Sequence, residues 1–106
     1  MQVLWRSPAS GGEHGLLMLG WPEATWHLEL VDDPSLTPTP TEEDLLVLYL
    51  GNAVAAATVR RVVEAGGRAV QARNPYWDEW GVTFEDPDGY RIVLSSRNWS
   101  NTPSEA

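Results

Sequence analysis

The chain lacks cysteine altogether and has few basic residues, and both shortages narrow its chemistry. The absence of cysteine excludes a disulfide framework, a thiolate zinc site and a cysteine nucleophile. Seven basic residues stand against 15 acidic ones, so the formal net charge is −8 at pH 7. Nucleic-acid binding needs a basic surface that neutralises phosphates, and we therefore expect no nucleic-acid partner. An acidic surface attracts cationic small molecules, but an ordinary soluble acidic protein without such a ligand has the same charge.

Basic N-terminal stretches and long apolar runs are also missing, whereas tryptophan is abundant. Residues 1–8 contain neither the basic start nor the apolar run of a signal peptide, and no membrane-spanning run follows. We therefore expect a cytoplasmic protein with no membrane partner. A chain of 106 residues is of the length of one domain. Six tryptophans in so short a chain are its most unusual compositional feature.

Residues 1–31 have the pattern of three antiparallel strands joined by short turns. The expected strands cover residues 3–5, 15–21 and 25–31. In the third strand the alternation places His27 and Glu29 on one face and Trp26 on the other. A proline-rich linker follows at residues 32–44, because three prolines keep it extended and out of any central strand.

The second half has the pattern strand–helix–strand–strand–strand. Strands are expected at residues 45–50, 68–73, 81–85 and 90–95, with a helix between the first two. Asn52 is the predicted cap at the start of the helix, and Gly66-Gly67 is predicted to end it. The sequence Asp-Pro-Asp-Gly at residues 86–89 predicts a hairpin turn, in which Gly89 is free to adopt a positive φ.

The connection at residues 74–80, "NPYWDEW", carries three large aromatic side chains: Tyr76, Trp77 and Trp80. Such side chains are costly to leave in water. They either form the wall of a ligand site or close the end of a core, and their chemistry alone leaves both interpretations open.

The segment "FEDPDGYRIVL", residues 84–94, resembles the ending of vicinal oxygen chelate proteins. This superfamily includes glyoxalase I, extradiol dioxygenases, fosfomycin-resistance enzymes and bleomycin-resistance proteins. The segments "WHLELV" and "NPYWDEWGVTFEDPDG" resemble its small glyoxalase-like members.

The resemblance implies a single α+β domain over residues 1–106, built from paired βαβββ modules around a U-shaped cleft. Here the first module, residues 1–31, is shortened to three strands, residues 32–44 form the linker, and residues 45–97 form the second module. Whether the lost strand and helix are truly absent, or precede the sequence as given, stays open.

In the metal enzymes of this superfamily, a divalent cation is held by residues of the first and last strands of each module. The resemblance places one family glutamate on Glu29 and the other on Val93. It places a family histidine on Leu45, or on Asp44 if the register shifts by one residue. Hydrocarbon side chains cannot ligate a hard cation. His27 is two residues from Glu29 on the same face, so a substitute pair is conceivable.

The resemblance therefore predicts a metal-free protein that binds a small organic ligand, aromatic or cationic, in an apolar cleft shared by a homodimer. The expected ligand-binding residues are Tyr49, Tyr76, Trp77, Trp80, Arg91 and Val93. The alternative is a metal-dependent lyase or dioxygenase that uses His27 and Glu29, with a divalent metal as its cofactor. A third reading is a subunit that only assembles with a partner.

Overall fold

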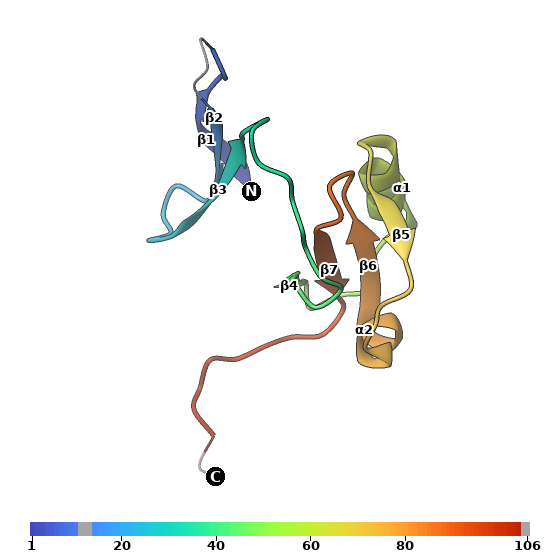
Figure 1. Ribbon diagram of the computed structural model, residues 1–106. Helices are drawn as coiled ribbons and strands as arrows, with labels where there is room; N and C mark the ends of the chain where they lie inside the picture. The colour runs from blue at the N-terminus through green and yellow to red at the C-terminus, as the bar shows by residue number, and fades with distance from the viewer. Residues whose placement is uncertain (11–13, 105–106) are drawn as a thin grey trace. The chain divides into compact units, whose positions relative to one another are not determined.

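The chain divides into two compact units, residues Met1–Thr37 and Pro38–Ala106. The computed structural model describes residues 1–10 and 14–104. The division falls within the proline-rich segment at residues 32–44, which contains neither helix nor strand after Asp32. Each unit has its own sheet, and Figure 1 traces the chain from one to the other.

The first unit is a three-stranded antiparallel sheet in the order β1-β2-β3. Its strands are β1 (Gln2–Ser7), β2 (Gly15–Gly20) and β3 (His27–Asp32). All three predicted strands are present, and the register of the sheet pairs Met18 with Glu29. No helix occurs in the described part of this unit, and its large apolar side chains stay partly in water: Trp26 is 50% exposed.

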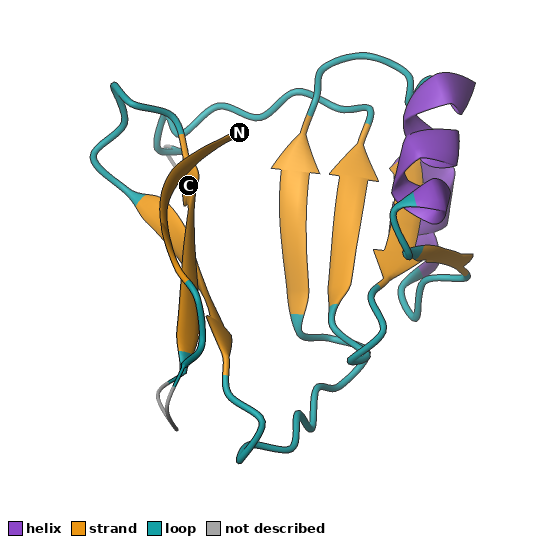
Figure 2. Cartoon of the chain, turned by 90° about the horizontal axis from the view of Figure 1, so that it is seen from above, coloured by secondary structure: helices purple, strands orange, loops and turns teal. Residues whose placement is uncertain are grey.

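The second unit is a four-stranded mixed sheet with two helices (Figure 2). Its elements are β4 (Leu45–Tyr49), α1 (Ala56–Glu64), β5 (Arg68–Val70), α2 (Pro75–Trp80), β6 (Gly81–Glu85) and β7 (Arg91–Ser95). The strand order is β4-β7-β6-β5, with β4 parallel to β7 and the other pairs antiparallel. The predicted strands and helix follow one another in the predicted order, although α2 was not predicted, and the α+β class is confirmed. No helix in the described residues is long and apolar enough to cross a membrane.

The start of helix α1 was predicted wrongly, whereas its end was predicted correctly. The residue before the helix is Ala55, and no side chain caps it. Asn52 lies too far upstream for that role, and its side-chain amide instead donates to the Leu50 carbonyl at 3.4 Å. At the other end Gly66 has φ 110°, a conformation that favours glycine and stops the helix after Glu64.

The aromatic connection contains a helix that the sequence interpretation missed. Asn74 caps α2 by accepting a hydrogen bond from the backbone N–H of Tyr76 at 3.0 Å, and Pro75 occupies the first turn. The strand expected at residues 68–73 is also shorter, because the backbone N–H of Ala72 donates to Asp78 of α2 at 3.0 Å. An asparagine followed by a proline is a local signal for a helix start, so α2 was readable from the sequence.

The turn between β6 and β7 forms as predicted. The Asp86 carboxylate accepts hydrogen bonds from the backbone N–H groups of Asp88 and Tyr90, each at 2.9 Å. Gly89 has φ 92°, which confirms its role in the turn.

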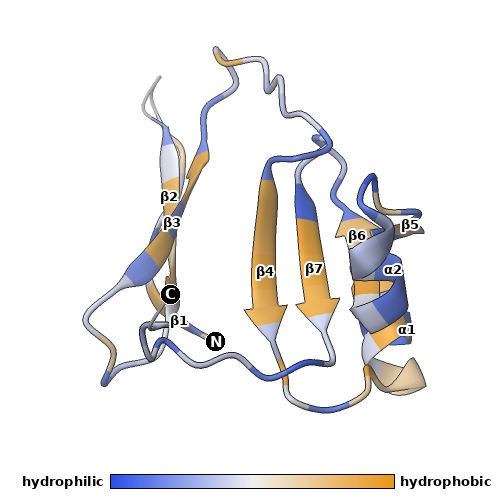
Figure 3. Ribbon diagram, turned by 90° about the horizontal axis from the view of Figure 1, so that it is seen from below, coloured by the Kyte–Doolittle hydropathy of each residue, from blue (hydrophilic) through white to orange (hydrophobic). Residues whose placement is uncertain are grey.

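The core of the second unit lies around β6 and β7, and Figure 3 shows the apolar length of β4 and β7. Phe84 and Val93 are fully buried. The register aligns Val47, Val93 and Thr83 across three adjacent strands, so these three residues share one face of the sheet. We call this surface the Val93 face. Arg91 and Tyr49, each two residues along from this row, belong to the same face.

Candidate functional site

A row of alternating charges crosses the Val93 face at one end of the sheet. The register pairs Arg91 of β7 with Glu85 of β6, and Glu85 with Arg68 of β5. Arg91 Nε donates to Glu85 Oε2 at 3.1 Å, and Arg68 Nη2 donates to Glu85 Oε1 at 2.8 Å. Glu42, which precedes β4, lies 3.7 Å from Arg91 Nη2. We call Glu42, Arg68, Glu85 and Arg91 the charged row.

The Glu85 carboxylate is the centre of this row. The hydrogen bond from Arg91 is the main cause that lowers the pKa of Glu85 below its ordinary value of 4.5; desolvation opposes it, and Arg68 adds to it. The side chain of Arg91 is only 9% exposed, so this guanidinium is held inside the unit. The row thus combines two bases with two acids and has no net charge.

At the other end of the Val93 face, Tyr49 lies between two tryptophans. Its ring centroid is 6.4 Å from that of Trp77 in an edge-to-face arrangement and 5.8 Å from that of Trp99 in a stacked one. Tyr76 contacts Trp77 with a centroid distance of 5.0 Å. We call Tyr49, Tyr76, Trp77 and Trp99 the aromatic cluster. Tyr49 is 39% and Trp99 69% exposed, so the cluster presents apolar surface to water.

Two predicted ligand-binding residues, Trp80 and Val93, belong neither to the aromatic cluster nor to the charged row. The ring of Trp80 is covered by the Arg97 guanidinium, whose Cζ is 4.6 Å from the ring centroid. Its backbone carbonyl also accepts a hydrogen bond from the Ser96 hydroxyl at 2.8 Å, which ties the end of α2 to the end of β7. Val93 is fully buried, so its side chain is not accessible on the surface of the unit. Trp99 was not predicted, because its contact with Tyr49 joins residues fifty positions apart.

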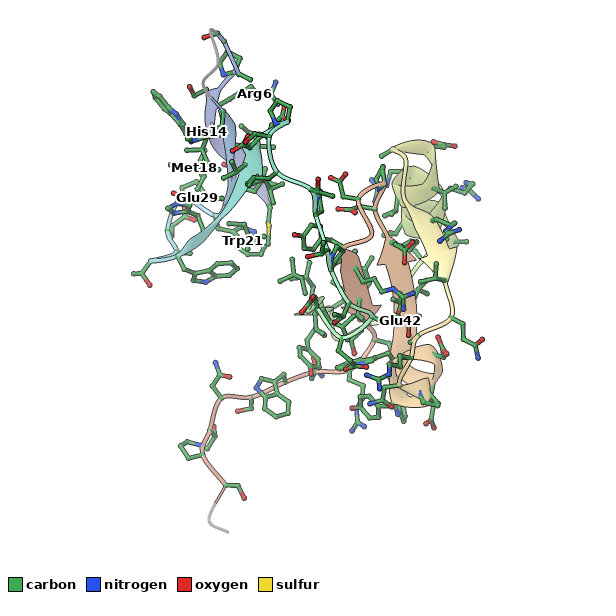
Figure 4. All side chains as sticks on the ribbon, in the orientation of Figure 1. Arg6, His14, Met18, Trp21, Glu29 and Glu42 are labelled. Atoms are coloured by element: carbon green, nitrogen blue, oxygen red, sulfur yellow. The ribbon has the colours of Figure 1, made fainter. Side chains whose placement is uncertain are left out.

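The two candidate metal ligands lie in the first unit. His27 Nε2 and Glu29 Oε1 are 3.1 Å apart on β3, so they share a face as predicted, and both side chains are well exposed. His14 and Glu29 are labelled on this unit in Figure 4, as is Glu42 in the second unit.

The described residues do not fit the superfamily's metal. Leu45 and Val93 provide no donor atom at the two positions carried over from the metal enzymes. Within residues 1–10 and 14–104, no three His, Cys, Asp or Glu side chains are grouped so that they could hold an ion. A pair of ligands from one strand leaves most of a cation's coordination shell unfilled.

The first unit also has an open depression of about 450 Å³, lined mainly by β2, β3 and the segment after β1. Its lining includes Leu16, Leu30 and Asp32. None of the predicted ligand-binding residues or metal ligands contributes to it.

The mixed sheet in the order β4-β7-β6-β5, with helix α1 between its first two strands along the chain, defines an α+β domain of the glyoxalase type. Residues 43–96 match the YycE-like C-terminal domain, and the chain belongs to this family. The match confirms the predicted glyoxalase-type relationship. The finer bleomycin-resistance and dioxygenase branches stay predictions.

Two relatives support the assignment. The uncharacterized protein YycE of Bacillus subtilis (strain 168) is 45% identical over 81 residues, which are 74% of this chain and 58% of that protein. The chain therefore spans little more than half the length of this curated relative. The 2.0 Å crystal structure of a YycE protein of unknown function from Bacillus subtilis, assigned provisionally to the glyoxalase/fosfomycin resistance proteins, is 34% identical. It superimposes with a TM-score of 0.78 and covers 96% of this chain and 76% of its own.

Proposed function

We propose that the chain binds a small organic molecule at the aromatic cluster of its second unit. The observation that carries this proposal is the exposure of Tyr49 and Trp99, which stack on each other while much of their surface stays in water. A flat apolar molecule that covers these rings removes their surface from water and gains stacking contacts. A positive charge on such a molecule would add a cation–π contribution and would suit the acidic chain.

We propose that this binding needs no resident metal, because Leu45 and Val93, at positions where the metal enzymes have ligands, provide no donor atom. The alternative, a metal-dependent lyase or dioxygenase, draws its support from the 3.1 Å contact of His27 with Glu29. For that function the remaining ligands would have to come from a substrate, from solvent or from a second chain.

We further propose that two copies assemble, in the cytoplasm, so that each first unit is covered. The sheet order leaves β1 and β3 each with one neighbour in the described part of this unit. Strand edges with unpaired N–H and C=O groups favour pairing with another chain. Trp26, beside the edge strand β3 and half exposed, is the side chain that such an interface should bury.

The binding proposal is tested by titrating the protein with an aromatic cation such as phenyltrimethylammonium and following tryptophan fluorescence. Saturable quenching is expected. Trp77→Ala should weaken binding by roughly 1–3 kcal/mol, the range for loss of an aromatic contact at a binding surface. Trp21→Ala, in the first unit, is the matched control and should leave the affinity unchanged. If Trp77→Ala instead lowers the melting temperature and leaves binding intact, the cluster only closes the core.

A further inference from the structure

Two buried polar atoms on the Val93 face have no hydrogen-bond partner. Among the residues that the structure describes, Thr83 Oγ1 and Arg91 Nη1 are the buried side-chain nitrogen or oxygen atoms in this state. Nearly all such atoms in folded proteins are hydrogen-bonded, because an unpaired buried group loses its hydrogen bonds to water and gains none within the protein. Two of them in one small unit therefore call for an explanation by function.

The strand register places the residues that carry these two atoms diagonally across neighbouring strands, where one ligand can reach both. The register pairs Thr83 with Val93 and Glu85 with Arg91, so Thr83 and Arg91 occupy diagonal positions on neighbouring strands. Diagonal residues on one face are about 7–8 Å apart at the backbone, within reach of a long side chain. A single oxygen between them can accept from Arg91 Nη1 and from the Thr83 hydroxyl.

The charged row decides what kind of oxygen fits. Arg91 already directs Nε at Glu85 and Nη2 at Glu42, which leaves Nη1 as its free donor. Because two carboxylates balance the two guanidinium groups of the row, a carboxylate or phosphate ligand would add an uncompensated negative charge. A cation would meet Arg91 itself. An uncharged carbonyl oxygen uses both free groups and leaves the balance intact.

We propose that Thr83 and Arg91 form the polar end of the ligand site and accept an uncharged carbonyl, of an amide or a ketone, as their partner. The inference rests on the proposed function, in which the aromatic cluster holds the apolar end of the same molecule. On this face Thr83 lies two strands away from Tyr49 and two residues farther along the strand direction. That corresponds to about 12 Å. A phenyl ring and a carbonyl joined by a chain of about seven methylene groups suit this separation.

Entry of the ligand requires the cover of the face to move, because both atoms are buried. Arg73, beyond β5, and Glu43, before β4, form an ion pair at 3.7 Å between the segments flanking the two edge strands. Such a pair has to cross a face of the sheet. Since Glu42 of the same turn contacts Arg91, we place the crossing on the Val93 face. Both side chains of the pair are largely exposed, and exposed ion pairs are weak enough to open.

The test compares two molecules that differ in the head group alone, 8-phenyloctanamide and 8-phenyloctanoate. Dissociation constants are measured at pH 7 by two-dimensional amide NMR titration of the full chain. The amide should bind about tenfold more tightly than the acid. Thr83→Val, which replaces the hydroxyl by a methyl group of similar size, should weaken amide binding about five- to tenfold, the effect of losing one hydrogen bond. Thr83→Ser keeps the hydroxyl and should retain the affinity.

The outcomes separate this inference from the proposed function. If the acid binds as tightly as the amide, or if Thr83→Val leaves amide binding unchanged, the polar end is not where we place it. The proposed function still stands in that case if Trp77→Ala weakens both compounds alike. If neither compound binds up to its solubility limit but phenyltrimethylammonium does, this inference alone falls. If phenyltrimethylammonium does not bind either, the proposed function and this inference fall together.

Discussion

Replacing Thr83 by valine should make the protein more stable, because the Thr83 hydroxyl is buried without a partner. A buried polar group left unpaired costs about 1–3 kcal/mol, and the methyl group that replaces the hydroxyl adds apolar burial. Since valine has nearly the volume of threonine, the fully buried site needs no repacking. We expect the free energy of unfolding to rise by about 1–2 kcal/mol. For a chain of this size the melting temperature should rise by about 4–8 °C per kcal/mol.

Ser95 provides the matched control for this substitution. It carries another fully buried hydroxyl on the Val93 face, but this hydroxyl has partners: it accepts from the Arg97 backbone N–H at 3.2 Å and its O–H donates to the Trp80 carbonyl at 3.4 Å. Ser95→Ala should therefore lower the free energy of unfolding by about 1 kcal/mol. Urea unfolding measures both variants, with the slope of the transition checked for constancy. If Thr83→Val loses as much stability as Ser95→Ala, the Thr83 hydroxyl is bonded in the folded chain and our reasoning about it fails.

Three further predictions concern pH, metal and assembly. The Arg91 hydrogen bond lowers the folded pKa of Glu85, so its stabilisation is present above the unfolded value of 4.5 and is lost as the pH falls through the folded value. Urea midpoints between pH 6 and pH 3 should therefore fall less steeply for Glu85→Gln, and equal slopes would contradict the assignment. Elemental analysis after dialysis should find no stoichiometric divalent ion; one equivalent that disappears in Glu29→Ala would support the metal-dependent alternative. Light scattering after size exclusion should give a dimer that Trp26→Glu dissociates, and a wild-type monomer at micromolar concentration would refute the shared interface.

Where sequence and structure agree, the cause is local chemistry. The turn at residues 86–89 forms because aspartate accepts from backbone N–H groups two and four residues ahead, and because Gly89 tolerates a positive φ. The strands follow from their apolar alternation, which needs no knowledge of neighbours. Helix α2 could also have been predicted, since Asn74 and Pro75 are a local start signal; the aromatic residues that follow drew the interpretation toward a loop instead.

The sequence by itself therefore determined the order of the strands and of helix α1, the turn and the glyoxalase-type relationship, because these depend on residues close together along the chain. The resemblance to the superfamily also placed Tyr49 and Arg91 together at the expected ligand site. Only the tertiary structure decided which side chains meet there. The charged row joins residues of β5, β6 and β7 through strand register, and Trp99 reaches Tyr49 across fifty positions. Whether a hydroxyl such as that of Thr83 finds a partner depends on every neighbour around it, and packing alone settles that.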